Sequence, residues 1–132
     1  MNKAPADRLK GLRVLVVEDQ MLIAEILEEC LGDLDCQVVG PTGSVEAALK
    51  LVDANDIDAA VLDVNLGQEM VYPVAEELEA RNVPFAFTTG YGERGMPERW
   101  RARPRLAKPY NHDQFEQFMC DVFLDPDSPS RP

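Results

Sequence analysis

Short apolar runs alternate with longer segments of helical periodicity along most of the chain. The runs lie at residues 14–17, 38–39, 59–62 and 85–87, with a weaker one around Leu106, and each is short enough to be a buried strand. Strands that alternate with helices pair in parallel, and helices cover both faces of the sheet. The pattern therefore predicts an α/β fold with a five-stranded, doubly wound parallel sheet.

The first helix signal is the clearest. Between residues 21 and 31, apolar side chains recur at helical spacing, and Gly32 follows as the predicted stop. An amphipathic helix of this kind turns its apolar face to the core. The side chains expected on that face are Leu22, Ile23, Ile26, Leu27 and Leu31.

Three further helices are predicted from their caps and periodicity. Ser44 is expected to cap a helix that runs to about Val52, and another helix is expected over residues 72–81. Near the end of the chain, Asn111 is followed three residues later by Gln114, which is the spacing of a capping box. Apolar residues at helical spacing then predict the last helix.

Length and composition fit one globular domain. The chain has 132 residues, of which 45% are apolar and 28% charged, enough for a conventional core and too apolar for bulk disorder. We expect this domain at residues 11–124, with loose polar tails at 1–10 and 125–132. Because only a short tail follows the last predicted helix, we expect the domain to stand alone.

Cysteine usage and the short apolar runs indicate the compartment. Cys30, Cys36 and Cys120 have no metal-ligand spacing and lie in or beside apolar stretches, as is typical of reduced packing residues. No stretch has the pattern of a secretion signal or a membrane span. We therefore predict a cytoplasmic location.

The net charge excludes two kinds of partner. At −11, the chain repels the phosphate backbone of nucleic acids and the surface of anionic lipids. We therefore expect neither nucleic acid nor membrane among its main partners.

Acidic side chains follow two of the predicted strands at the edge where a doubly wound sheet carries its chemistry. Glu18 and Asp19 follow the first run, and Asp63 follows the third, with Asn65 two residues later. In the strand order 2-1-3-4-5 the first and third strands are neighbours, so these carboxylates should converge. Because clustered carboxylates need a cation, we predict a Mg²⁺ site, which takes carboxylate and carbonyl oxygens and water.

The fourth and fifth runs end in residues that suit phosphoryl transfer. Thr88 and Thr89 end the fourth run, and Lys108 follows the fifth. Beside a metal ion, Asp63 could supply the attacking oxygen while Lys108 neutralises charge on the transferred group. The combination predicts phosphorylation of an aspartate.

Each of these residues also has a simpler interpretation. Asp19 could cap the helix that follows it, and Asp63 could be a turn residue in a segment rich in Asp, Asn and Gly. Thr89 could be an ordinary loop residue, and a lysine before a proline is usually a solvated surface residue. The functional interpretation gains weight because four strand ends carry the required residue types together.

With these motifs the chain resembles the receiver domain of two-component response regulators over about residues 11–124. The matching stretches are VLVVED, AAVLDVNL, PFAFTTG and LAKPY. The resemblance implies a flavodoxin-like fold, a Mg²⁺ site made by Glu18, Asp19, Asp63 and the main-chain carbonyl of Asn65, and phosphorylation on Asp63. It also implies a switch hydroxyl on Thr89, a functional lysine at Lys108 and a cis peptide bond before Pro109.

The segment between the fourth and fifth strands departs from the usual receiver pattern. Receivers commonly carry an aromatic residue three positions before the lysine, where this chain has Arg105. The segment is short and rich in Gly and Pro, so we expect a brief or irregular fourth helix. Its TTGYG stretch is similar to an alpha-proteobacterial subset of single-domain receivers with a Phe-x-Thr-Gly signature, and Tyr91 is a hypothetical replacement for the missing aromatic switch.

The same segment is basic although the chain is acidic. Residues 94–108 contain six basic residues against one acidic residue, a local charge of +5 that leaves −16 for the rest. Trp100 lies among the arginines, a composition typical of interaction hot spots. We hypothesise that this face docks an acidic partner, although a solvated loop would explain any single arginine. The basic residues are Arg94, Arg99, Arg101, Arg103, Arg105 and Lys108.

The resemblance implies a signalling domain that catalyses only its own phosphorylation and dephosphorylation. A sensor histidine kinase is the expected phosphodonor, and a downstream protein of unknown identity is the expected target. Relay of phosphate, or its removal from a shared kinase, remains open. Alternatives are a metal-dependent phosphohydrolase of the haloacid dehalogenase kind, a flavodoxin-like flavin-binding domain, or a receiver that acts without phosphorylation.

Overall fold

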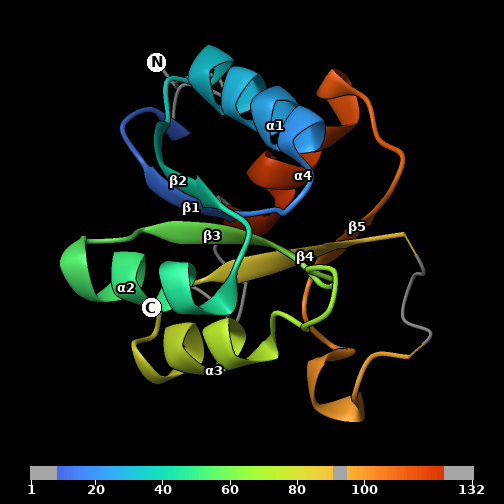
Figure 1. The fold of residues 1–132 in the computed structure, drawn as a ribbon. Helices are drawn as coiled ribbons and strands as arrows, with labels where there is room; N and C mark the ends of the chain where they lie inside the picture. Colours follow the sequence, from blue (N-terminus) through green and yellow to red (C-terminus); the bar gives the residue numbers. More distant parts are fainter. Residues whose placement is uncertain (1–8, 91–94, 124–132) are drawn as a thin grey trace.

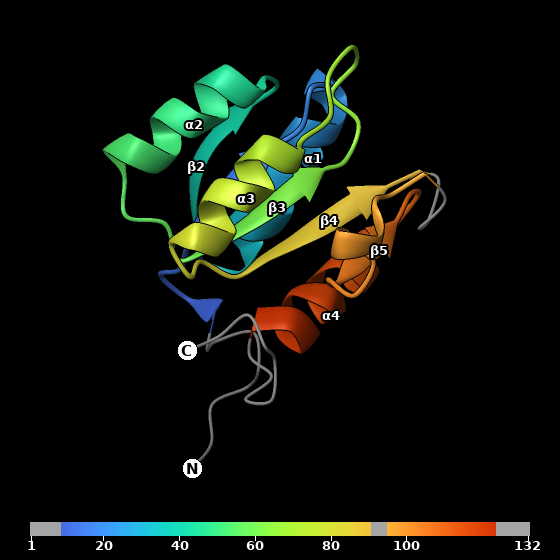
Figure 2. The same cartoon turned by 90° about the horizontal axis from the view of Figure 1, so that it is seen from below.

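The computed structural model describes residues 9–90 and 95–123. Five parallel strands form one sheet in the order β2-β1-β3-β4-β5, which confirms the predicted fold class and strand order. The sheet lies between two helical layers, as Figures 1 and 2 show. The strands are β1 (Arg13–Val17), β2 (Gln37–Thr42), β3 (Ala59–Asp63), β4 (Phe85–Thr89) and β5 (Arg105–Ala107).

The helices divide between the two faces of the sheet. α1 and α4 cover one face, and α2 and α3 cover the other (Figure 1). Between β4 and β5, the described residues form only a short 3-10 helix, as the Gly- and Pro-rich sequence predicts. The helices are α1 (Met21–Asp33), α2 (Val45–Ala54), α3 (Tyr72–Ala80), the 3-10 helix η2 (Glu98–Trp100) and α4 (His112–Phe123). Across the described ranges, no helix has the length and hydropathy needed to cross a membrane.

Two of the predicted caps are confirmed. The Ser44 hydroxyl accepts a hydrogen bond from the Ala47 amide at 3.1 Å and starts α2. At α4, Asn111 and Gln114 exchange side-chain to main-chain hydrogen bonds of 2.8 Å each, which makes a complete capping box. These local interactions fix the residues at which α2 and α4 begin.

The core has two parts because the sheet is buried on both faces. Every residue of β3 and β4 is buried, as expected for central strands of a parallel sheet. One cluster lies under α2 and α3, and the other lies under α1 and α4. Cys30 and Cys36 are buried and Cys120 is partly buried, and all three are free thiols, in line with their predicted packing role.

The predicted buried face of α1 is partly wrong. The helix continues through Gly32 to Asp33, and its buried residues are Ala24, Leu27, Cys30 and Leu31. Leu22 and Ile26 are 70% and 46% exposed, respectively, although both were expected inside. At about 3.6 residues per turn, they lie on the side of the helix opposite Ala24. The apolar residues cover more of the circumference than the sheet can bury.

Trp100 belongs to the core. Only 2% of it is exposed, and its ring stacks on Tyr72 with centroids 6.2 Å apart and an angle of 4° between the planes. Phe85 and Phe87 contact it edge-on. The hypothesis that Trp100 belongs to an exposed partner face is therefore wrong. Because no α-helix covers this part of the sheet in the described residues, the indole fills that place itself.

Replacing Trp100 by Ala should strongly destabilise the fold. Removing a buried Trp side chain leaves a cavity and typically costs about 3–5 kcal/mol of unfolding free energy. Chemical denaturation measures this loss. Leu22→Ala is the matched control, because Leu22 is 70% exposed and its truncation should change the free energy by about 0.5 kcal/mol or less. Equal losses in the two variants would contradict the core assignment.

Candidate functional site

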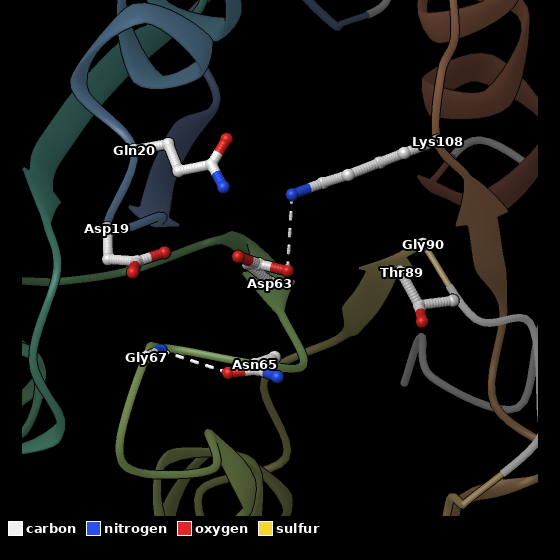
Figure 3. Close-up of a pocket in the computed structure, with 8 residues that line it drawn as sticks. All are labelled: Asp19, Gln20, Asp63, Asn65, Gly67, Thr89, Gly90 and Lys108. Atoms are coloured by element: carbon white, nitrogen blue, oxygen red, sulfur yellow. Dashed lines mark hydrogen bonds and ion pairs between the residues drawn. The ribbon is translucent and has the colours of Figure 1, made fainter.

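An open pocket of about 460 Å³ lies at the carboxyl ends of the strands. Figure 3 shows its lining, with Asp63 near the centre, Asp19 on one side, and Lys108 and Thr89 on the other. Residues from four strand ends thus meet here, at the edge where the sequence places them. The lining residues are Asp19, Gln20, Asp63, Asn65, Gly67, Thr89, Gly90 and Lys108.

Three carboxylates cluster at this edge. Carboxylate oxygens of Glu18, Asp19 and Asp63 lie within 4.8 Å of one another. Glu18 and Asp63 are 3% and 5% exposed, whereas Asp19 is exposed. The parallel pairing of β1 with β3 sets Val17 opposite Leu62, so the residues that follow both strands come together. This is the convergence expected from the strand order.

Lys108 reaches into the cluster from the end of β5. Its Nζ lies 2.9 Å from Glu18 Oε1 and 3.3 Å from Asp63 Oδ1. Burial by itself lowers the pKa of Lys108, but the two carboxylates outweigh it and raise the pKa above its ordinary value. Lys108 is therefore a fixed positive charge rather than a solvated surface lysine. The peptide bond before Pro109 is cis, as the resemblance implies.

The cluster is short of positive charge. The pKa of Asp63 is raised to about 7, mainly by burial and then by the hydrogen bond and negative charge of Glu18, while Lys108 opposes the shift. One ammonium does not fully compensate two buried carboxylates and a third beside them. An all-oxygen donor set of this kind fits a hard divalent cation such as Mg²⁺. Glu18, Asp19 and Asp63 are the residues that could hold it.

Asp19 is not the cap of α1. Gln20 occupies the N-cap position and makes no side-chain capping hydrogen bond. The Gln20 amide instead donates to Glu18 Oε2 at 3.1 Å, which holds the Glu18 carboxylate from the helix side. Asp19 lines the pocket, which supports the functional interpretation over the capping one.

The turn after β3 forms the lower wall of the pocket in Figure 3. Asn65 pairs with Met70 in an isolated antiparallel bridge, and the Val71 amide donates to the Val64 carbonyl at 3.1 Å. The Asn65 side-chain oxygen accepts a hydrogen bond from the Gly67 amide at 2.9 Å. Asn65 therefore lies beside the cluster, and coordination by its main-chain carbonyl stays a prediction.

Thr89 ends β4 on the far side of Asp63 from Asp19 (Figure 3). It is 3% exposed and lines the pocket together with Gly90, so it is not an ordinary loop residue. Tyr91, the hypothetical aromatic switch, lies outside the described residues. Gln20 and Gly67 also line the pocket and were not among the predicted site residues. Their signals in the sequence are that Gln20 directly follows Asp19 and that Gly67 lies in the Asp-, Asn- and Gly-rich turn after Asp63.

Comparison with known protein families decides the identity. A family model described as the response regulator receiver domain matches residues 14–118, which spans the whole acidic cluster and Lys108. The chain belongs to this receiver family. Among curated proteins, no significant match is found.

Solved structures agree with the family. The chain is similar to SdrG from Sphingomonas melonis Fr1, with 44% identity, a TM-score of 0.74, and coverage of 83% of this chain and 93% of SdrG. It is also similar to a BeF3-activated conformation of SdrG, described as from Pseudomonas melonis Fr1, at 46% identity and TM-score 0.70, with 81% and 92% covered. The response regulator PhyR from Brucella abortus shares the fold, at 24% identity and TM-score 0.79, over 91% of this chain and 51% of PhyR.

The basic segment of this receiver is partly neutralised by α3. Arg99 lies 2.6 Å from Glu79 and 3.4 Å from Glu76, and Arg103 lies 2.7 Å from Glu79. The Arg99 guanidinium also stacks over the Trp100 ring, 4.4 Å from its centroid. These arginines therefore attach the connection between β4 and β5 to the body of the domain.

The remaining arginines bond locally. Arg101 Nε donates to the Met96 carbonyl at 3.0 Å, and Arg105 donates to the Arg101 carbonyl at 2.6 Å. Arg94 lies outside the described residues. Docking of an acidic partner on Arg99, Arg101, Arg103 and Arg105 stays a prediction, and any such partner would compete with Glu79 for Arg99 and Arg103.

Glu79→Gln should weaken this attachment. Hydrogen bonds from Arg99 and Arg103 hold the pKa of Glu79 below its ordinary value. The ionised Glu79 carboxylate therefore stabilises the fold at pH values above the ordinary pKa of a glutamate, and this stabilisation is lost as the pH falls through the lowered pKa. Exposed ion pairs are worth about 0.2–1 kcal/mol each, so we expect a loss of about 0.5–1 kcal/mol at neutral pH. Denaturant unfolding across pH measures it.

The exposed Glu28 of α1 provides the matched control. Glu28→Gln should leave the unfolding free energy nearly unchanged at every pH. At acid pH the Glu79 carboxyl is protonated, so Glu79 and its Gln replacement are both neutral. If Glu79→Gln still lost the same unfolding free energy there, the stabilisation would not be ionic.

Proposed function

We propose that this receiver accepts a phosphoryl group on Asp63 from a sensor histidine kinase, with Mg²⁺ bound, and signals through protein contacts that depend on phosphorylation. The observation that carries the proposal is the placement of Asp63 itself. Asp63 is 5% exposed, yet it lines an open pocket and has Lys108 Nζ 3.3 Å from its carboxylate. A buried carboxylate that remains accessible from one side is suited to act as a nucleophile.

The transfer step is a displacement at phosphorus. One carboxylate oxygen of Asp63 forms the new bond to phosphorus, and the bond between phosphorus and the donor histidine nitrogen breaks, its electron pair staying on the imidazole. Lys108, fixed by Glu18, lies where it can neutralise the oxygens of the transferred group. Glu18, Asp19, Asp63 and the Asn65 main-chain carbonyl would hold a Mg²⁺ ion, which would supply further positive charge to those oxygens.

Thr89 supports a change of state after transfer. Its side chain lies next to the pocket at the end of β4, and in Figure 3 its hydroxyl is turned away from the Asp63 carboxylate. Rotation toward a phosphoryl group on Asp63 would give that group a hydroxyl donor and shift the end of β4. Phosphorylation would then stabilise one of two arrangements of the segment that follows β4.

Asn65 argues against the phosphohydrolase alternative. Such enzymes use a second aspartate two residues after the nucleophile as acid and base, and an amide cannot take that role. Here the Asn65 side chain instead accepts a hydrogen bond from Gly67. The acidic Glu18 and Asp19 likewise disfavour the flavin-phosphate alternative, because they would repel a phosphate.

The direct test is incubation with Mg²⁺ and acetyl phosphate, followed by intact mass measurement. The wild type should gain one acid-labile phosphoryl group, and Asp63→Asn should gain none. Asp56→Asn is the matched control, because Asp56 is exposed just before β3, at the opposite end of the sheet, and it should be labelled like the wild type. Absence of labelling under conditions that label another receiver would refute the proposal.

A kinase must bring its histidine to this pocket, and α1 offers an apolar surface beside it. Met21 and Leu22 are 77% and 70% exposed and directly follow Asp19 and Gln20, which line the pocket. Ile26 extends the same exposed face. We therefore assign this face of α1 to contact with the histidine-bearing domain of the kinase.

Leu22→Glu should separate docking from chemistry. With a sensor kinase that labels the wild type, transfer to Leu22→Glu should slow by about tenfold or more, since a charge replaces a central apolar contact. Labelling by acetyl phosphate should stay at the wild-type rate because Asp63 and Lys108 are untouched. Equal slowing with both donors would show that the variant damages the site rather than the contact.

A further inference from the structure

Asp19 lies between two glycines from neighbouring loops. Gly43 follows β2, and a Cβ atom added there would lie 2.9 Å from the Asp19 Cα and 3.2 Å from its Cβ. Gly67, in the turn after β3, would place a Cβ atom 3.5 Å from Asp19 Oδ2. The first separation is shorter than real Cβ contacts allow, so any side chain at Gly43 must displace something.

The contact at Gly43 involves main chain that is held on both sides. The Glu18 amide donates to the Thr42 carbonyl at 2.9 Å, so the residue before Asp19 and the residue before Gly43 are bonded to each other. The register of β2 against β1 shifts between Leu15 and Val17 and ends with Val17 opposite Thr42. A rotamer change cannot relieve a clash with a Cα atom, so the Asp19 backbone or the loop itself would have to move.

The second loop is joined to the first. Glu69 Oε2 accepts a hydrogen bond of 3.2 Å from the Val45 amide, two residues after Gly43. On the other side of the turn, the Asn65 side chain holds the Gly67 amide at 2.9 Å. Gly67 has a φ of +81°, which suits the tight turn that brings it beside Asp19. The two loops therefore flank Asp19 as a connected pair.

This arrangement accounts for how the exposed member of the acidic cluster keeps its place. Glu18 and Asp63 are buried and fixed by Lys108, but Asp19 is exposed, and α1 begins at Met21 without a side-chain cap. We propose that Gly43 is a positioning residue: because it lacks a Cβ atom, the loop after β2 can hold Asp19 where its carboxylate joins Glu18 and Asp63 at one cation site. This inference rests on the proposed cation site.

The test is the affinity for Mn²⁺, a paramagnetic substitute for Mg²⁺ whose free-ion resonance signal disappears on binding. Outer-shell partners of metal ligands are typically worth about 10- to 100-fold in affinity, and we expect Gly43→Ala to weaken Mn²⁺ binding by about this factor. Gly32→Ala is the matched control, because an added Cβ at Gly32 on α1 meets nothing within 4 Å. It should bind Mn²⁺ like the wild type.

A second comparison separates positioning from general damage. In an Asp19→Asn background, Gly43→Ala should cause little further loss of Mn²⁺ affinity, because the carboxylate it acts through is gone. An equal fold-loss in both backgrounds would overturn the proposal. So would wild-type affinity in Gly43→Ala. A wild-type chain that binds no Mn²⁺ would instead refute the cation site of the proposed function, and this inference with it.

If circular dichroism shows that Gly43→Ala does not fold, the link between the loops provides the test. Glu69→Ala removes the acceptor for the Val45 amide without adding bulk, and it should reduce Mn²⁺ affinity several-fold. Glu69→Gln keeps an acceptor oxygen and should bind Mn²⁺ more tightly than Glu69→Ala. Unchanged affinity in Glu69→Ala would overturn the proposal.

Discussion

The rest of the structure depends on one constraint, which is that Glu18 and Asp63 are buried side by side. Lys108, which follows the fifth strand, contacts both carboxylates. Two buried carboxylates repel each other and lose hydration, and a single ammonium offsets only part of that cost. The residual imbalance appears as the raised pKa of Asp63. In the proposed function, a bound cation would relieve this imbalance, and the Asp63 carboxylate would share an oxygen with an electrophilic phosphoryl group.

The fold supplies this arrangement through parallel strand pairing. Neighbouring parallel strands end at the same edge, so residues after β1, β3, β4 and β5 meet although as many as 90 positions separate Glu18 from Lys108. Cores on both faces hold the strands in register, and the loops after β2 and β3 flank Asp19. Between β4 and β5, η2 is fixed to the domain by Trp100 and by the ion pairs of Arg99 and Arg103 with α3.

Much of the fold and the site follows from the sequence because the relevant signals are local. Apolar runs, caps at Ser44 and Asn111, and acidic residues directly after strands each depend on a few adjacent positions. The failures concern three-dimensional competition for burial. The pattern predicts Leu22 in the core and Trp100 on a partner surface, but the sheet leaves Leu22 exposed. Trp100 is buried because, among the described residues, no α-helix lies between β4 and β5. The closeness of Gly43 to Asp19 has no sequence signal because it depends on the register of two strands.

The central claim is that the four strand ends form one phosphoryl site around Asp63. Amide NMR spectra recorded with and without beryllofluoride and Mg²⁺, as a stable substitute for the phosphoryl group, test it most directly. We expect shifts concentrated at Glu18 to Gln20, Asp63 to Gly67, Thr88 to Gly90 and Lys108, and we expect Asp63→Asn to lose them. Spectra that do not change, or that change equally in Asp63→Asn, would contradict it.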